Sequence, residues 1–287
     1  MKFTTYLRQG APRLAVVDGQ HLIDLNDANA QIPADVRAAL RAGVDLQAAG
    51  RKAIEAGQRQ SLDTVKLAPL VPEPGKIICL GLNYYDHAKE GGREKPDYPW
   101  FFFRAPSSLV AHGEAGWLPK VSTRFDYEAE LAVVIARTVP RHTKQADALQ
   151  YVFGYSCFND MSVRDYQKRT PQWTIGKNFD RTGGFGPALV TADELAPGAT
   201  GLRIQSRLNG QVMQDANTDD MIFSVAETIA LLAEVLTLEP GDVIVMGTPA
   251  GVGQARNPPV WMKAGDTIEI EIDRVGLLSN PIANEGA

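Results

Sequence analysis

The sequence predicts a mixed α+β fold that is rich in β-strand, with a small N-terminal α+β domain at residues 1–70 and a larger domain at residues 71–287. We predict the boundary from Pro69, Pro72 and Pro74, because three prolines within six residues prevent regular structure. Beyond this boundary, short apolar runs alternate with turn residues, which is typical of strands.

The elements of the N-terminal domain are readable in order. Residues 14–23 are largely apolar on both sides of Asp18-Gly19, a pair that favours a tight hairpin turn. An alanine-rich stretch then runs to about Ala56, and its composition predicts a helix. In the larger domain, Ser224–Leu236 has apolar residues at helical spacing and predicts another helix.

Residues 126–135 predict a strand in which side chains two positions apart share a face. One face carries a continuous apolar stripe, formed by Tyr127, Ala129, Leu131, Val133 and Ile135. The other face begins with Glu128 and Glu130 and continues with small or apolar residues. The strand therefore has a core-facing side and a side that presents two carboxylates at one end.

The two neighbouring carboxylates have two interpretations. They repel each other, and a divalent cation with oxygen ligands would offset that repulsion. Alternatively, they mark a solvated strand end that carries two acids by chance. The spacing of Glu128 and Glu130 leaves both interpretations open.

A strand-to-helix corner follows at residues 158–167. Ser162 with Asp165 three positions later resembles a capping box, which predicts that a helix starts there. Asp160 then lies in the corner between strand and helix, a place that often supplies side chains that bind a metal or a substrate. Arg164 and Gln167 are three residues apart, so we expect them to share one face of the helix.

Two later segments add polar groups to apolar surroundings. Lys177 lies among apolar and small residues at 173–180. A buried strand at 243–246 runs into a glycine-rich turn at 247–253 that contains Thr248.

An upstream segment carries a histidine and a carboxylate close together. His87 and Glu90 would meet across one helical turn. The polar, glycine-rich sequence at 84–99 suits a lid that closes on a ligand, whereas the plainer alternative is an ordinary surface loop.

Five of these segments, in this order, resemble the motifs of the fumarylacetoacetate hydrolase family. They read G-L-N-Y-Y-D-H-A-K-E, D-Y-E-A-E-L, N-D-M-S-V-R-D-Y-Q, G-K-N-F-D and G-T-P-A-G-V-G. The resemblance covers about residues 70–282 and implies the β-roll of that family for the larger domain. Arg104 stands where a lysine is common in the family.

The resemblance also implies roles for individual residues. Glu128, Glu130 and Asp160 match the ligands of a divalent ion, usually Mg²⁺ or Mn²⁺. His87 and Glu90 match a catalytic dyad on the lid.

Further positions match groups that contact the substrate or the metal-bound water. Lys177 is assigned to catalysis beside the dyad. The residues assigned to substrate binding are Asn83, Arg164, Gln167 and Thr248.

These parts imply chemistry on a chelating 2-oxo acid. With His87 activating water and Lys177 placing positive charge beside a leaving enolate, we expect hydrolysis of a carbon–carbon bond in an acylpyruvate or related 2,4-dioxo acid. The same enolate chemistry serves a 2-oxo acid decarboxylase, tautomerase, isomerase or hydratase acting on oxaloacetate- or 2-hydroxymuconate-type substrates, which is the alternative. A binding module that lost the chemistry is a more remote alternative, since it would not need this set of polar residues.

Composition restricts the partners and the compartment. The net charge of −5, from 29 basic and 34 acidic residues, argues against nucleic acid and anionic membranes as partners. No apolar run approaches the ~18 residues that span a bilayer, and the first residues do not resemble a signal peptide. Cys79 and Cys157 lie in apolar runs and are predicted to be small buried hydrophobic residues, which suits the cytoplasm.

We expect a homodimer built through the larger domain, chiefly because the resemblance implies one. The aromatic run Trp100–Phe103 adds support, because a monomer would have to bury it alone. The alternative is that these aromatic residues belong to the core.

Overall fold

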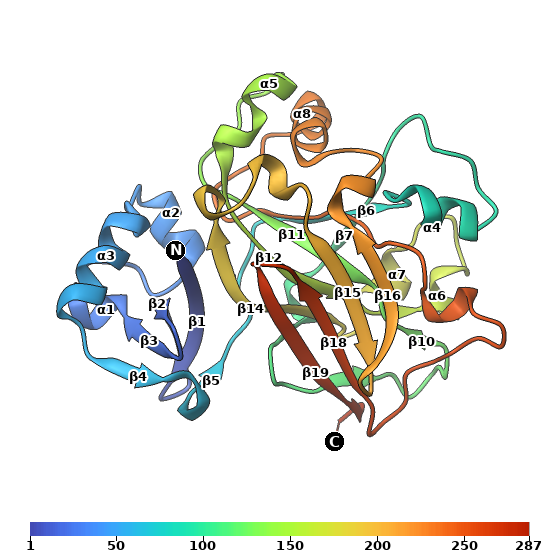
Figure 1. Ribbon diagram of the computed structural model, residues 1–287, viewed down its shortest axis with the longest axis horizontal. Coiled ribbons are helices and arrows are strands. Elements are labelled where there is room, and N and C mark those ends of the chain that lie inside the picture. Colours follow the sequence, from blue (N-terminus) through green and yellow to red (C-terminus); the bar gives the residue numbers. More distant parts are fainter. Residues whose placement is uncertain (287) are drawn as a thin grey trace.

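The computed structural model describes residues 1–286 and contains two sheets that pack face to face, with helices along the borders (Figure 1). In the described part of the chain, the larger sheet has the strand order β4 (Arg59–Ser61), β3 (His21–Asp24), β2 (Ala11–Asp18), β1 (Lys2–Arg8), β14 (Gly183–Thr191), β12 (Val152–Asp160), β11 (Ala129–Ile135), β17 (Val243–Val245), β6 (Ile77–Gly81) and β7 (Trp100–Arg104). Two short strands join it from the side, β5 (Lys66–Leu67) on β1 and β8 (Leu109–Ala111) on β14.

A smaller sheet covers one face of the larger one. Its strands lie in the order β16 (Gln211–Asn217), β15 (Arg203–Leu208), β18 (Thr267–Ile272), β19 (Gly276–Asn284) and β9 (Gly116–Leu118). A separate pair joins β10 (Phe125–Asp126) to β13 (Ser162–Val163). The helices are α1 (Leu25–Ala28), α2 (Val36–Arg41), α3 (Leu46–Ala56), α4 (Tyr85–Glu90), α5 (Gln145–Ala148), α6 (Arg164–Gln167), α7 (Thr174–Lys177) and α8 (Val225–Val235).

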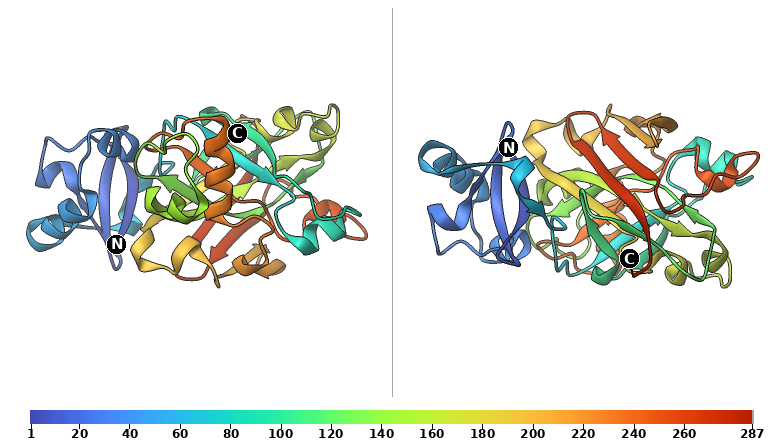
Figure 2. Two further views of the ribbon diagram at one scale, coloured as in Figure 1. Left: turned by 90° about the horizontal axis from the view of Figure 1, so that it is seen from above. Right: turned by 90° about the horizontal axis from the view of Figure 1, so that it is seen from below.

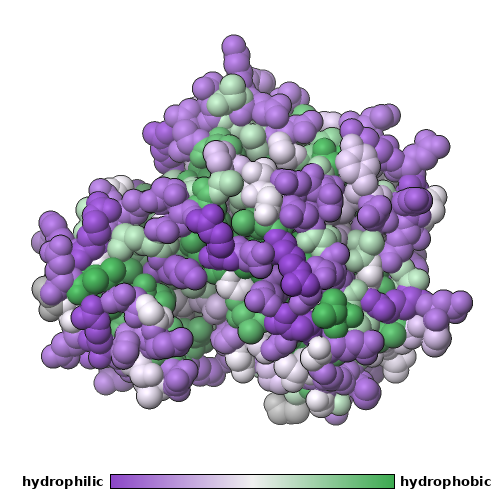
Figure 3. Space-filling model, viewed as in Figure 1, coloured by the Kyte–Doolittle hydropathy of each residue, from purple (hydrophilic) through white to green (hydrophobic). Residues whose placement is uncertain are grey.

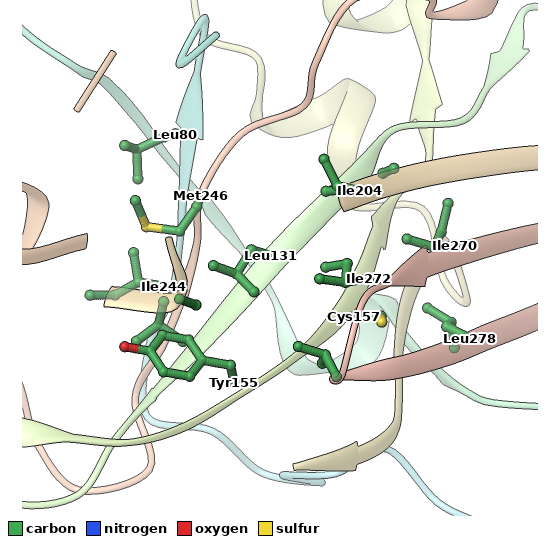
Figure 4. Close-up of a cluster of buried hydrophobic side chains, with 14 of the residues drawn as sticks. Leu80, Leu131, Tyr155, Cys157, Ile204, Ile244, Met246, Ile270, Ile272 and Leu278 are labelled. Atoms are coloured by element: carbon green, nitrogen blue, oxygen red, sulfur yellow. The ribbon is translucent and has the colours of Figure 1, made fainter. Parts of the chain in front are cut away.

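The main core lies between the two sheets. Leu131 and Ile244 from the larger sheet and Ile204 and Ile270 from the smaller one belong to the same buried cluster (Figure 4). Every residue of β11 is buried, because its two faces contribute to different clusters. The apolar stripe predicted for this strand lies in the core between the sheets, which confirms the predicted alternation.

The N-terminal segment forms a lobe at one end of the molecule but shares the larger sheet (Figure 2). Its predicted hairpin is confirmed, since Asp18 pairs with His21 across a tight turn in which Gly19 has φ +60°. The predicted alanine-rich helix is α3. Because β1 pairs antiparallel with β14, backbone hydrogen bonds tie this lobe directly to the rest of the chain.

Two local predictions about helices have opposite outcomes. The helix α8 is confirmed, and the Ser224 side chain caps it by accepting from the Glu227 amide. The helix predicted after Ser162 is present as α6, but the capping box is wrong, because Ser162 is an extended residue of β13 and α6 begins at Arg164 without a side-chain cap. The Ser162 hydroxyl donates instead to the Asp160 carbonyl at 2.9 Å. Strand pairing with β10 therefore overrides the local capping signal.

The surface is polar over most of the face seen in Figure 3, with hydrophobic residues in small separate groups. No helix in residues 1–286 is long and apolar enough to cross a bilayer. Cys79 and Cys157 are free and buried, as predicted.

Candidate active site and metal centre

Three buried carboxylates meet where β11 begins beside the last residue of the antiparallel strand β12. One ligand oxygen of each of Glu128, Glu130 and Asp160 lies within 4.8 Å of the other two. The Asp160 amide donates to the Glu128 carbonyl at 3.0 Å, so the strand ladder itself sets this spacing. The strand end is buried, which removes the interpretation of Glu128 and Glu130 as a solvated edge.

Buried cations partly offset the three acids. The Lys177 ammonium contacts Glu128 and lies 2.6 Å from Asp160 Oδ2. Arg104 Nη1 lies 2.5 Å from Asp160 Oδ1, and Arg104 Nη2 donates to the Thr182 hydroxyl. Asp160 is thus held from two sides by groups from distant segments of the chain.

Arg164 and Asp126 form a second buried pair beside the triad. Arg164 Nε lies 2.8 Å from Asp126 Oδ2, and Arg164 Nη2 lies 2.7 Å from Glu128 Oε1. Arg164 Nη1 donates to Gln167 Oε1 at 3.0 Å, so these two residues do share a face of α6. Asp126 also accepts from the amides of Gly253 and Gln254, which fixes the turn after β17.

The pKa values of the acids diverge. Burial raises the pKa of Glu128, but the charges of Arg164 and Lys177 outweigh burial, so that this pKa lies below its ordinary range. Burial and the charges of Asp160 and Glu128 raise the pKa of Glu130 well above its ordinary range. Glu130 keeps one anion-stabilising contact, from the Gly247 amide at 2.6 Å.

The donor set fits a divalent cation. Around the triad, the buried acids, with Asp126, outnumber the buried cations Arg104, Arg164 and Lys177 by one. Oxygen-only ligands suit hard ions such as Mg²⁺ and Mn²⁺. Such an ion would supply the positive charge that Glu130 lacks.

The histidine dyad lies on α4. His87 Nδ1 is 3.2 Å from Glu90 Oε2, so these two side chains meet across one helical turn as the sequence predicts. Glu90 Oε1 accepts from the Gly251 amide at 2.9 Å, which ties α4 to the glycine-rich turn after β17. Ala88 packs against Ile222 and Phe223 on the other side of the helix.

One cavity of about 650 Å³ collects most of the predicted site residues. Those that line it are His87, Glu90, Glu128, Glu130, Arg164, Gln167, Lys177 and Thr248. Leu82, Phe102, Trp173 and Val252 supply apolar walls. A concave apolar site with a few convergent polar groups is the usual form of a small-molecule site.

Two predicted site residues, Asp160 and Asn83, do not line this cavity. Asp160 lies behind the wall, 2.6 Å from the Lys177 ammonium. Asn83 has a different role. It is fully buried, its amide donates to the carbonyls of Phe223 and Met246, and its oxygen accepts from the Phe223 amide. Asn83 also packs closely against Gly247, which has a φ of +86°. A side chain at position 247 would place its Cβ only 2.8 Å from a side-chain atom of Asn83. Asn83 thus anchors the start of α4 to the turn after β17, in place of the predicted contact with substrate.

Comparison with known proteins identifies the family. The model of the fumarylacetoacetate (FAA) hydrolase C-terminal domain matches residues 76–283. The chain belongs to the fumarylacetoacetate hydrolase family. The predicted resemblance and fold class are therefore confirmed, and the family is one of enzymes.

The relatives favour one branch of this family chemistry. The mitochondrial oxaloacetate tautomerase fahd2 of Xenopus laevis is 39% identical over 272 residues, which cover 94% of this chain and 85% of the relative. The oxaloacetate tautomerase YisK of Bacillus subtilis is 44% identical over 226 residues, covering 77% of this chain and 74% of the relative. Maleylpyruvate hydrolase of Sphingobium sp. SYK-6, solved with manganese(II) and pyruvate, has a TM-score of 0.83 at 31% identity and covers 99% of both chains. The relatives support the tautomerase alternative better than the predicted carbon–carbon hydrolase.

Two residues of the site, Asp126 and Arg104, were not predicted as site residues from the sequence. Asp126 opens the Asp-Tyr-Glu-Ala-Glu run, and its place on the strand face shared with Glu128 was an available signal. Arg104 was visible only as a departure from the usual lysine, with nothing local to indicate its contact with Asp160.

Proposed function

We propose that this protein is a metal-dependent tautomerase that interconverts the keto and enol forms of oxaloacetate or a similar 2-oxo dicarboxylic acid. The observation that carries the proposal is the buried triad of Glu128, Glu130 and Asp160, of which the two glutamates line a cavity together with His87 and Lys177. The relatives of this chain include oxaloacetate tautomerases.

Tautomerisation moves one proton between C3 and the oxygen on C2 and consumes no water. A divalent ion held by the triad would act as a Lewis acid toward that oxygen. Lys177 adds fixed positive charge beside the same acids, in a water-poor environment where charge stabilisation is strong.

His87 is the proposed proton carrier. Because Glu90 engages His87 Nδ1, the ring keeps Nε2 available to take the proton from C3 and return it to the oxygen. Glu90 is itself held by the Gly251 amide, so the dyad has a fixed place on the cavity wall.

The test follows the ultraviolet absorbance of enol-oxaloacetate mixed with the Mg²⁺- or Mn²⁺-loaded protein. We expect decay faster than with metal alone, and a loss of about 10²–10⁴-fold in turnover for His87→Asn. His142→Asn is the matched control, because His142 is exposed and does not line the cavity. An unchanged rate in His87→Asn would remove its role, and no acceleration by the wild type would remove the proposed activity.

A second candidate function is hydrolysis of an acylpyruvate, which the maleylpyruvate hydrolase neighbour favours. The same His87–Glu90 pair would then deprotonate water for attack on the carbonyl further from the metal. Release of pyruvate from an acylpyruvate, measured with a coupled dehydrogenase, distinguishes this reaction from tautomerisation, which releases no product fragment.

A further inference from the structure

A second cavity of about 290 Å³ adjoins the active-site cavity. The two cavities share Arg164, Lys168 and Gln254 as lining residues. Arg124 and Trp261 are among the other residues that line the second one. The two cavities therefore adjoin at these three residues.

The side chamber begins one side chain away from the carboxylate triad. Arg164 Nη2 lies 2.7 Å from Glu128 Oε1, and the same residue lines both cavities. The triad and the side chamber therefore both adjoin the buried Arg164 side chain.

The chamber carries positive charge that the protein leaves uncompensated. Arg164 is neutralised by Asp126 and Glu128. Lys168 and Arg124, in contrast, form no ion pair with any residue that the structure describes, and both side chains are exposed. In a chain with a net charge of −5, two unpaired cations in one concave site favour an anionic ligand.

Gln254 adds a polar group at the junction. Its backbone amide is fixed by Asp126 Oδ2 at 3.0 Å, and its side-chain Oε1 is buried without a hydrogen-bond partner among the described residues. Because an amide can be turned to exchange its oxygen and nitrogen, this position can present donors to a carboxylate.

We propose that the side chamber is a subsite for the distal carboxylate of the substrate, bound by Lys168 and Arg124 with Gln254 at the entrance. The proposal rests on the proposed function, in which the 2-oxo acid end binds at the triad. It extends the substrate class from oxaloacetate to longer 2-oxo dicarboxylic acids. The volume agrees, since 650 Å³ lies in the range of about 300–1,000 Å³ that houses drug-sized ligands, far more than a four-carbon acid fills.

The experiment compares ligands that differ only at the far end. The Mn²⁺-loaded full-length protein is titrated calorimetrically with oxalate, with 2-oxohexanoate and with 2-oxoadipate, which has the same carbon number as 2-oxohexanoate and a second carboxylate. We expect the wild type to bind 2-oxoadipate about tenfold more tightly than 2-oxohexanoate, as one charge-assisted contact predicts. The double variant Lys168→Gln, Arg124→Gln should lose that preference and bind oxalate as the wild type does.

The matched control is Arg51→Gln, Lys52→Gln, which removes the same two charges from α3 at the opposite end of the molecule (Figure 1). It should keep the preference for 2-oxoadipate. A single Lys168→Glu variant should reverse the preference, because its carboxylate repels the second carboxylate of the ligand.

The possible failures are distinguishable. Absence of oxalate binding to the wild type would overturn the proposed function. Normal oxalate binding, with equal affinity of wild type and double variant for 2-oxoadipate, would overturn the subsite alone. A loss of affinity that is the same for all three ligands would also overturn it, because the cations would then act only through general electrostatic attraction.

Discussion

Each buried charge near the triad depends on its partners. Asp160 accepts from both Arg104 and Lys177, so its removal leaves two buried cations with fewer acceptors. Unpaired buried charges cost about 3–5 kcal/mol, which makes Asp160→Ala a poor probe of metal binding because it also destabilises the fold. Asp160→Asn keeps the shape and one acceptor oxygen and is the better variant.

We predict that Asp160→Asn weakens Mn²⁺ binding by more than about 100-fold. Loss of a residue that only supports a metal ligand typically costs about 10–100-fold, and loss of a ligand itself should cost more. Calorimetric titration of the metal-free protein with Mn²⁺ measures this, and the melting temperature should fall less than in Asp160→Ala. Asp147→Asn, at an exposed position on α5, is the control and should bind Mn²⁺ as the wild type does. Wild-type Mn²⁺ affinity in Asp160→Asn would remove Asp160 from the ligand set.

The stability of the N-terminal lobe depends on pH through Asp24. Burial raises the pKa of Asp24, but hydrogen bonds from Arg13 Nε at 2.8 Å and the Tyr6 hydroxyl at 2.6 Å outweigh burial and lower it below its ordinary value. Because the folded pKa lies below the unfolded one, the stabilisation is present above the unfolded pKa and is lost as the pH falls through the folded pKa.

Asp24→Asn should therefore reduce the free energy of unfolding by about 1–3 kcal/mol at neutral pH. The difference from the wild type should shrink as the pH falls below about 4, the ordinary pKa of aspartate. Urea unfolding at several pH values measures it, with the exposed Asp63→Asn as control. A difference that stays constant down to low pH would show that the ionised form of Asp24 contributes nothing.

At the scale of elements, α4 is held by few contacts. Glu90 bonds to the Gly251 amide, Ala88 packs on Ile222 and Phe223, and the segment beyond Gly91 has no regular structure up to β7. An element with so few buried contacts opens at low free-energy cost. A lid at residues 84–99 requires such low-cost opening and stays a prediction.

We predict that Glu90→Ala speeds tryptic cleavage between Lys89 and Lys95, because it releases α4 from the turn after β17. In the wild type, Mn²⁺ with oxalate should slow the same cleavage. Glu94→Ala is the control, since Glu94 is exposed in the same segment. Equal cleavage rates in wild type and Glu90→Ala, with or without ligand, would contradict a lid held through Glu90.

At the scale of the whole molecule, the larger sheet ends in a partly apolar edge. Among the described strands, β7 pairs only with β6. The aromatic run on β7 is split, because Phe102 is buried whereas Trp100 and Phe103 are 42% and 48% exposed. Nearby Ile175 on α7, which packs against β7, is 46% exposed. The run is therefore only partly core, and an uncovered edge with exposed aromatic residues suits a homodimer.

Phe103→Asp should shift the protein from dimer to monomer at micromolar concentration, because it places a charge in the predicted interface. Sedimentation velocity measures the change. Val212→Asp on β16 is the matched control, as Val212 is 47% exposed on the other sheet. A wild type that sediments as a monomer would contradict the predicted dimer.

Features that depend on neighbours along the chain follow from the amino-acid pattern alone. The period of two in residues 126–135 assigned Tyr127 and Leu131 to the core and Glu128 and Glu130 to the opposite face. The spacing of Arg164 and Gln167 likewise predicted their contact on α6. These inferences hold because backbone geometry alone fixes which side chains share a face.

Contacts between distant segments, in contrast, depend on how the whole chain packs. No local pattern indicates that Arg104 contacts Asp160, that Asp126 holds both Arg164 and the turn at Gly253, or that β1 joins the larger sheet through β14. Ser162 shows the same limit, since its capping signal gave way to strand pairing with β10. The physical reason is that a buried charge must find a partner and a strand must find a neighbour wherever packing brings one, and packing is a property of the whole chain.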